Sequence, residues 1–273
     1  MKKVLTLLGL LVVCGIQPAM AALVFSAPPR ESAADGEKIY APLAKFFSEI
    51  LGEKVEYEHP QNWIQYARNM RDGRYDIVFD GPHFSAWRMN NVGHTPVVRL
   101  KGALGFVLIA HKNNRTINTL DDLVGKKICG LASPNLGTVS VFALFKNPVK
   151  QPQMVNITGG MRNVLETFLN TKQCDAAVIR DKLYGALPQE KKDIIKIIAK
   201  SKSMPNQTVT MNSKILKGNK DIIVEALLSP SGGSAAAQNI FKRFSKKQNS
   251  FMKADDVEYT ELELLLEGVV FGW

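Results

Sequence analysis

The chain has 273 residues, of which 45% are hydrophobic and 22% are charged. This composition is that of an ordinary globular protein and excludes a largely disordered chain, whose hydrophobic content would be low. The formal net charge of +10 favours anionic solutes through the summed field of the protein. The lysines are too scattered to predict a face for nucleic acid, and we expect no nucleic-acid partner.

The N-terminus has the order of a secretory signal peptide. Two lysines at positions 2 and 3 precede the apolar run Val4–Val13, and Ala19-Met20-Ala21 supplies small residues at −3 and −1. We predict cleavage after residue 21, because the apolar run is shorter than the roughly 20 residues that span a bilayer. Lipid anchoring at Cys14 is the less favoured alternative, since valine is a poor residue just before a lipidated cysteine. Removal of residues 1–21 from 273 leaves 252, and the loss of two lysines lowers the net charge from +10 to +8.

Strands and helices then alternate, which predicts α/β layers with a mainly parallel sheet. The strands predicted in the first part cover residues 23–26, 55–58, 75–79, 97–100 and 105–111. A helix is predicted over 36–51, where Gly52 ends it as a C-terminal cap. A second helix begins at Asn62, a good N-cap residue, and a third follows Pro82.

The second part continues the alternation. A short helix is predicted over 119–125, with Thr119 as its N-cap. Further strands are predicted over 126–130, 154–157, 175–179, 194–199 and 208–211, and further helices from Thr138, over 163–171, 221–228, 234–246 and 260–267. The strand 208–211 is expected to carry the chain back to its first part. We therefore predict a signal peptide over 1–21, a discontinuous lobe 1 over 22–110 and 209–273, and lobe 2 over 111–208.

Two cysteines, Cys129 and Cys174, remain after cleavage of the signal peptide. An oxidising compartment allows a bridge between them. Both fall at predicted strands of the same lobe, so buried free thiols are the alternative that the sequence favours slightly.

The sequence carries no pattern of a catalytic or metal site. The four histidines lack metal-ligand spacing, and no GxSxG elbow, Walker loop or GxGxxG occurs. We predict a protein that is not an enzyme, with no catalytic residue, no metal and no cofactor.

Several loops at the carboxyl ends of predicted strands combine glycine with small hydroxyls, and ligands bind at such ends in open α/β sheets. The loop Ser133–Thr138 leads into a helix, where backbone N–H groups and the hydroxyls of Thr138 and Ser140 are suited to an oxyanion. An ordinary turn is an equally good interpretation of that loop. Thr158-Gly159-Gly160 repeats the arrangement at the next strand, which favours binding.

Charged side chains follow two other strands. Asp80 and His83 come after one strand, and Arg180 and Asp181 after another. An ordinary salt bridge to a neighbour remains an alternative explanation for each pair.

The chain resembles the phosphate/phosphite/phosphonate-type periplasmic substrate-binding proteins of ABC transporters. The likeness spans nearly the whole mature chain and is carried by these motifs, in order: Tyr40-Ala41-Pro42-Leu43, Leu51–Val55, Met70–Pro82, Leu120–Lys126, Ser133-Pro134-Asn135, Cys174–Val178 and Met204-Pro205-Asn206. The resemblance implies the type II periplasmic-binding fold, with two α/β lobes, two crossover strands and a ligand cleft between the lobes.

The resemblance also implies site residues. Its aromatic position falls on or beside Trp63, and its strand-end loop falls on Asp80-Gly81-Pro82. The family's hydroxyl-rich phosphonate cradle is reduced here to Leu136-Gly137-Thr138-Val139-Ser140, so Arg162 and Arg180 are candidates for bidentate contacts to another oxyanion. The candidate ligand-binding residues are Trp63, Asp80, Gly81, His83, Ser133, Asn135, Gly137, Thr138, Thr158, Gly159, Arg162, Arg180 and Asp181.

These features predict a monomeric receptor that captures a small, oxyanionic solute and delivers it to an ABC-transporter permease in the inner membrane. Closure about the two crossover strands would be driven by ligand contacts made only in the closed state. Two alternatives remain: a binding module that feeds a sensor kinase, and an enzyme built on the same scaffold.

Overall fold

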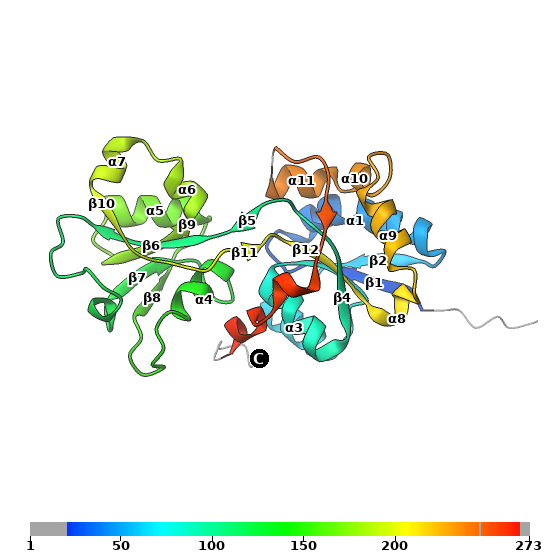
Figure 1. The fold of residues 1–273 in the computed structure, drawn as a ribbon, viewed down its shortest axis with the longest axis horizontal. Helices are drawn as coiled ribbons and strands as arrows, with labels where there is room; N and C mark the ends of the chain where they lie inside the picture. Colours follow the sequence, from blue (N-terminus) through cyan, green and yellow to red (C-terminus); the bar gives the residue numbers. More distant parts are fainter. Residues whose placement is uncertain (1–20, 246, 268–273) are drawn as a thin grey trace, which may run out of the picture.

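The computed structural model describes residues 21–245 and 247–267, which form two lobes lying end to end along the long axis (Figure 1). Each lobe has its own β-sheet, one of six strands and one of five. Residues 1–20 of the predicted signal peptide lie outside the described residues. Among those described, no helix combines the length and the apolar character needed to cross a membrane.

The sheet of lobe 1 is mixed. Its strands are β1 (Leu23–Ser26), β2 (Val55–Glu58), β3 (Ile77–Asp80), β4 (His94–Arg99), β12 (Thr208–Asn212) and β13 (Met252–Lys253). Their order is β13-β4-β12-β3-β1-β2. β1 pairs in parallel with β2 and β3, whereas β12 is antiparallel to both β3 and β4. The late strand β12 thus lies at the centre of a sheet that is otherwise built mostly from the first hundred residues.

Helices cover both faces of this sheet. On one face lie α1 (Ala33–Leu51), α9 (Lys220–Leu228), α10 (Gly233–Ala236) and α11 (Gln238–Phe244); on the other lie α2 (Trp63–Arg71) and α3 (Pro82–Val92), and α8 (Ser213–Leu216) follows β12. α1 buries Tyr40, Leu43 and Phe47 at helical spacing. Gly52 ends α1 in the left-handed conformation, with φ of 66°.

Lobe 2 is built on β6 (Phe106–His111), β7 (Lys127–Gly130), β8 (Gln153–Asn156), β9 (Ala176–Arg180) and β10 (Ile195–Lys200), in the order β10-β6-β9-β7-β8. The helix α5 (Met161–Asn170) packs on one face through Val164, Leu165 and Phe168. The helix α4 (Leu136–Phe142) and the 3-10 turn η1 (Asp121–Leu123) cover the other face. Two short helices, α6 (Asp181–Gly185) and α7 (Gln189–Asp193), connect β9 to β10.

The chain passes between the lobes twice. β5 (Ala103–Leu104) links β4 to β6, and β11 (Met204–Pro205) links β10 to β12. β5 and β11 pair with each other as a two-stranded antiparallel ladder. This arrangement confirms the predicted two-lobed fold with two crossover strands. Because β6 belongs to the second sheet, we propose lobe boundaries inside the crossover segments, at 100–105 and 201–207, instead of at residues 110 and 208.

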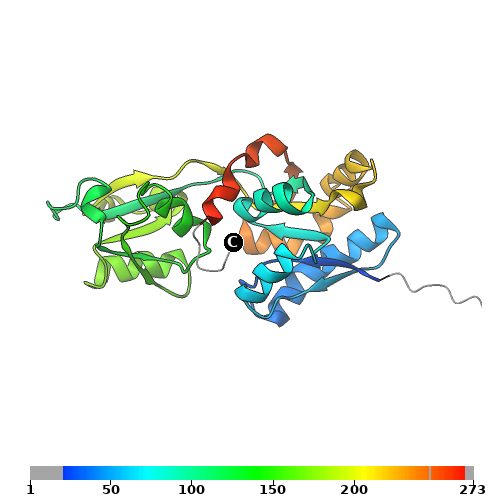
Figure 2. The same cartoon turned by 90° about the horizontal axis from the view of Figure 1, so that it is seen from below.

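The C-terminal segment touches both lobes. It contains the 3-10 turns η2 (Asp256–Tyr259) and η3 (Leu262–Leu266). Leu262 and Leu265 pack against the lobe 2 core that includes Phe106, whereas Leu266 is buried in the lobe 1 cluster that includes Tyr66. Figure 2 shows this segment at the junction of the two lobes.

Three predicted helices differ in the structure. Thr119 is not an N-cap; instead, Asp122 Oδ2 accepts hydrogen bonds of 2.9 Å from the backbone N–H groups of Asn118 and Thr119. The helix predicted over 234–246 is divided into α10 and α11 at Ala237. The helix predicted over 260–267 is a 3-10 turn, because its leucines pack on two different lobes and not on one continuous face.

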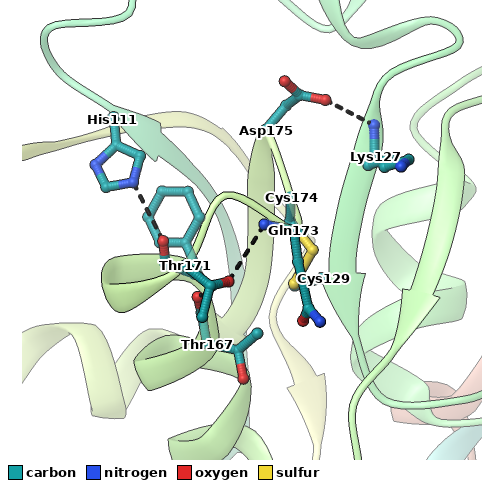
Figure 3. The surroundings of a disulfide bond; sticks show 9 residues. His111, Lys127, Cys129, Thr167, Thr171, Gln173, Cys174 and Asp175 are labelled. Atoms are coloured by element: carbon teal, nitrogen blue, oxygen red, sulfur yellow. Dashed lines mark hydrogen bonds between the residues drawn. A yellow bond between two sulfur atoms is a disulfide. The ribbon is translucent and has the colours of Figure 1, made fainter.

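Cys129 and Cys174 form a disulfide bond (Figure 3). The interpretation as buried free thiols is therefore wrong. β7 and β9 pair in parallel and align Ile128 with Ala176. Cys174, two residues before Ala176, therefore lies next to β7. The two Cα atoms are 5.6 Å apart, a separation at which a disulfide forms without moving the backbone.

Candidate functional site

A cavity of about 520 Å³ lies between the two lobes. Lobe 1 lines it with Pro29, Arg30, Trp63, Gly81, His83 and Phe84. Lobe 2 lines it with residues from the loops 131–136 and 157–161 and with Arg180, while Leu104, Phe106 and Gln207 come from the crossovers and their ends. The cavity thus lies beyond the carboxyl ends of β1, β3, β7, β8 and β9, where ligands bind in open α/β sheets.

Arg30 brings a positive charge to the cavity from lobe 1. It lies in the loop after β1, and its Nη2 is 3.4 Å from Asp80 Oδ1. Its Nη1 is buried and has no hydrogen-bond partner among the described residues. The guanidinium also lies over the ring of Phe244, with Cζ 5.9 Å from the centroid. Arg30 therefore keeps donor capacity that the rest of the described chain does not use.

A buried ionic cluster holds Asp80 behind Arg30. Arg88 Nη1 donates to Asp80 Oδ2 at 2.7 Å, Tyr66 donates its hydroxyl to the same oxygen, and Gly81 N–H donates to Oδ1 at 2.6 Å. Burial raises the pKa of Tyr66 well above its ordinary value, so the phenol stays protonated. Burial lowers the pKa of Arg88, but Tyr66 and Asp80 outweigh that effect and raise it overall. Because Asp80 and Arg88 balance each other, the charge of Arg30 remains in excess.

His83 connects the two lobes. It is almost fully buried in the first turn of α3, and its Nε2 lies 3.0 Å from the carbonyl oxygen of Pro134 in lobe 2. Since a carbonyl oxygen only accepts, Nε2 carries the proton and donates it. Burial lowers the pKa of His83 to about 4, so the imidazole is neutral at pH 7. The lobes are therefore already in contact beside the cavity.

Arg180 brings the second positive charge, from the end of β9. Its Nε is buried and has no hydrogen-bond partner in the part of the chain that the structure describes. The nearest carboxylate is that of Asp181, whose Oδ1 is 4.0 Å from Nε. The guanidinium lies over the ring of Phe106, with Cζ 5.7 Å from the centroid. Burial lowers the pKa of Arg180, and Asp181 opposes this effect.

The N-terminus of α4 offers fewer free donors than the sequence predicts. Asn135 Oδ1 accepts from Gly137 N–H at 3.0 Å. The hydroxyl of Thr138 donates to the carbonyl oxygen of Leu131 at 2.5 Å, and that of Ser140 donates to Gly137 at 3.1 Å. Thr138 and Ser140 are buried, and neither lines the cavity. Their hydroxyls stabilise the loop and the first turn of the helix.

Two predicted glycines are explained by close packing. A Cβ atom on Gly81 would lie 3.0 Å from Cε1 of His83, so a larger residue would displace that imidazole. A Cβ atom on Gly137 would lie 2.7 Å from the ring of Phe106. Glycine at these two positions lets His83 and Phe106, which line the cavity, pack closely against the backbone of their own lobes.

The structure brings together part of the predicted site. The predicted residues that line the cavity are Trp63, Gly81, His83, Asn135, Thr158, Gly159 and Arg180. Asp80 lies behind Arg30 and does not line the cavity itself. Those placed elsewhere are Ser133, Gly137, Thr138, Arg162 and Asp181.

Sequence reasoning missed Arg30, Phe106 and Gln207. A weak signal for Arg30 was present, because it lies in the loop after a predicted strand, four residues beyond the end of that strand, whereas Arg180 follows its predicted strand directly. Phe106 and Gln207 lie at the ends of the crossovers, and only the fold shows that both crossovers pass beside the cavity.

The charged side chains that line the cavity all carry a positive charge, among the residues described. Arg30 and Arg180 line it from opposite lobes, and among the described residues no carboxylate lines it. Within the same residues, no three His, Cys, Asp or Glu side chains converge as a group that could hold a metal ion. Two guanidiniums that face one space can form charge-assisted hydrogen bonds to a single oxyanion.

Comparisons with known proteins agree with this architecture. The family model described as "ABC transporter, phosphonate, periplasmic substrate-binding protein" matches residues 25–259. A search of curated proteins finds no match. The solved structures described next are less than 20% identical to this chain, so they show the fold alone.

Three solved structures illustrate the likeness. XAC2383 from Xanthomonas citri, bound to ATP, is 14% identical over 91% of this chain and 96% of its own, with a TM-score of 0.67. PhnD1 from Prochlorococcus marinus, in complex with methylphosphonate, is 13% identical over 90% and 97%, with a TM-score of 0.61. A binding-protein component of an ABC phosphonate transporter from Pseudomonas aeruginosa is 19% identical over 89% and 85%, with a TM-score of 0.57.

Proposed function

We propose a function from one premise: the chain belongs to the family of periplasmic substrate-binding proteins of phosphonate ABC transporters. On that premise, the protein captures a small oxyanionic solute in the cavity between its lobes and delivers it to a permease in the inner membrane. The proposal includes a non-catalytic role and a monomeric receptor. It also includes export by a signal peptide that is cleaved after residue 21.

The observation that carries the proposal is the pairing of Arg30 and Arg180 across the cavity. Each guanidinium has a buried nitrogen without a hydrogen-bond partner in the described chain, and no described carboxylate lines the space between the lobes. A cationic solute would meet two like charges there, whereas an oxyanion would satisfy both. Hydrogen bonds between ionised partners are about twice as strong as neutral ones.

Contacts from both lobes also explain how binding can be signalled to a permease. The crossovers β5 and β11 meet through only two residue pairs, Leu104 with Met204 and Ala103 with Pro205. A ligand held by Arg30 and Arg180 together adds its binding free energy to the closed arrangement only, which shifts the population of the lobes toward closure.

The test is a binding screen on the mature protein, residues 22–273. Thermal shift and isothermal titration calorimetry would compare phosphate, phosphite, alkylphosphonates, sulfonates and carboxylates with arginine and a neutral sugar. An oxyanion at about 100 times its Kd is expected to add roughly 2.7 kcal/mol to the unfolding free energy. Stabilisation by cationic or neutral compounds alone would overturn the proposal.

Delivery and export have separate tests. Cells that lack the protein are expected to lose uptake of the anion that stabilises it. Unchanged uptake would contradict the proposed role in transport. N-terminal sequencing of the periplasmic protein is expected to begin at Ala22. A chain that keeps Met1, or one lipidated at Cys14, would contradict the predicted cleavage.

A further inference from the structure

We infer that the solute is an organic oxyanion with an uncharged, apolar body of several carbon atoms, and not an inorganic oxyanion or an aminoalkylphosphonate. This inference rests on the proposed function, because it names the solute class of the same cavity. Three features of the cavity carry it: its apolar walls, the volume that remains while the lobes touch, and the kinds of polar group that its lining lacks.

Most of the lining residues are apolar. Trp63 and Phe84 stack on the lobe 1 side, with ring centroids 6.0 Å apart and an interplanar angle of 22°. Phe106 and Ile157 line the cavity from lobe 2. An inorganic oxyanion would turn its unpaired oxygens toward this hydrocarbon surface, and burying a polar group without a hydrogen bond costs free energy. A hydrocarbon body would instead gain from the same surface.

The volume of the cavity is measured with the two lobes already in contact beside it. His83 already contacts Pro134 across the lobes at 3.0 Å, and η3 packs on both lobes beside them. The cavity of about 520 Å³ is what remains with these contacts in place. Cavities of about 300–1,000 Å³ are typical of sites for drug-sized ligands, so a phosphate or phosphite ion would leave much of this space unfilled.

The polar groups at the N-terminus of α4, which the sequence predicts as the cradle of a small oxyanion, are already engaged. The hydroxyls of Thr138 and Ser140 donate to backbone carbonyls, and Asn135 Oδ1 accepts from the first turn of α4. The two guanidiniums of Arg30 and Arg180 therefore form the main anchor for the charged head. Such an anchor binds one face of an oxyanion and leaves the rest of the solute to the apolar walls.

The lining also lacks an anionic partner for an ammonium group, and its only buried unpaired acceptor among the described residues is the neutral Nδ1 of His83. No carboxylate among the described residues lines the cavity, and Asp80, which lies behind Arg30, has its oxygens bound by Arg88, Tyr66 and the Gly81 N–H. An aminoalkyl body would bring a positive charge with no counter-ion among the lining residues beside two guanidiniums. The body of the solute is therefore uncharged.

The experiment is a calorimetric series with one head group and a growing body. Methyl-, ethyl-, propyl- and butylphosphonate would be titrated into the mature protein, with inorganic phosphate and 2-aminoethylphosphonate for comparison. Each added methylene is expected to tighten binding about fourfold, equivalent to about 0.8 kcal/mol, so butylphosphonate binds about 60-fold tighter than methylphosphonate. 2-Aminoethylphosphonate, similar in size to propylphosphonate, is expected to bind more weakly than it.

The outcomes separate this inference from the proposed function. Affinity that stays flat or falls along the series, or 2-aminoethylphosphonate that binds tighter than propylphosphonate, overturns the inference while leaving an oxyanion receptor in place. Binding of no phosphonate, sulfonate, carboxylate or phosphate overturns both. Binding of carboxylates or sulfonates with the same dependence on chain length supports the inference and assigns a different head group.

A variant tests the same point from the protein side. Ile157→Thr keeps a β-branched side chain but replaces part of its hydrocarbon with a hydroxyl. It is expected to weaken butylphosphonate about fourfold more than it weakens methylphosphonate. The matched control is Ile194→Thr, at a position that is 51% exposed in the same lobe and outside the cavity; it is expected to change neither. An equal loss for both ligands in Ile157→Thr overturns the inference.

Discussion

Replacement of Arg180 by glutamine is expected to weaken anion binding without unfolding lobe 2. The Arg180 guanidinium has Asp181 at 4.0 Å and the Phe106 ring at 5.7 Å, and its Nε has no partner among the described residues. The exposed ion pair contributes about 0–1 kcal/mol and the cation–π contact about 0.5–1 kcal/mol. Burying an unpaired donor costs about 1–3 kcal/mol, so the two effects nearly cancel. We expect the unfolding free energy to change by no more than about 1 kcal/mol.

The affinity is expected to change far more. A hydrogen bond to a charged group contributes about 1.5–3 kcal/mol, so Arg180→Gln should weaken butylphosphonate about 10- to 150-fold. Urea unfolding of the unliganded protein and isothermal titration measure the two quantities separately. Arg162→Gln is the matched control, because Arg162 is exposed on α5 and does not line the cavity. Unchanged affinity in Arg180→Gln, or a loss of more than about 3 kcal/mol in stability, would refute the reasoning.

The remaining predictions concern stability. Replacing Cys129 and Cys174 by alanine opens a loop with a sequence separation of 45 and is expected to lower the unfolding free energy by about 4 kcal/mol; urea unfolding checks this, and a double variant that still responds to dithiothreitol contradicts it. Burial lowers the pKa of His83 to about 4 and that of His94 to about 3. Below pH 6.5 these two histidines therefore bind more protons in the unfolded chain than in the folded one. Their contribution to the unfolding free energy is constant above that pH and falls as the pH drops toward 4, by up to about 1.4 kcal/mol per histidine per pH unit. Thermal melts between pH 7.5 and 4.5 measure this, and a flat profile contradicts it. Asp80→Asn leaves buried guanidiniums without a counter-charge and is expected to cost about 3–5 kcal/mol; urea unfolding measures the loss, and the same change at an exposed aspartate is the control.

Much of the fold was predictable from the sequence, because buried strands and amphipathic helices leave clear patterns. β3 is buried at all four positions, and α1 carries its apolar residues at helical spacing. Both were predicted to within a few residues. The segment 260–267 was predicted wrongly as an α-helix, because Leu262, Leu265 and Leu266 look like one apolar face in the sequence. The structure divides these leucines between the two lobes.

The candidate site was less predictable, since it depends on residues that are distant in sequence. Arg180 follows its strand directly and drew attention as a charged residue at a strand end. Arg30 acquires its position from Asp80, fifty residues later. Thr138 was predicted as a donor because its hydroxyl lies at a helix N-terminus, but the carbonyl of Leu131 competes for that proton and wins. Only the tertiary structure shows such competition.

The C-terminal segment offers a position for a label that would report the proposed closure of the lobes. Its leucines are anchored in both cores, while Leu264 between them is 50% exposed and does not line the cavity. The two cysteines in the described chain are held in a disulfide. A single thiol introduced by Leu264→Cys would therefore take an environment-sensitive dye selectively, on a segment that contacts both lobes. Labelled in this way, the protein would report binding of its solute as a change in the fluorescence of the attached dye.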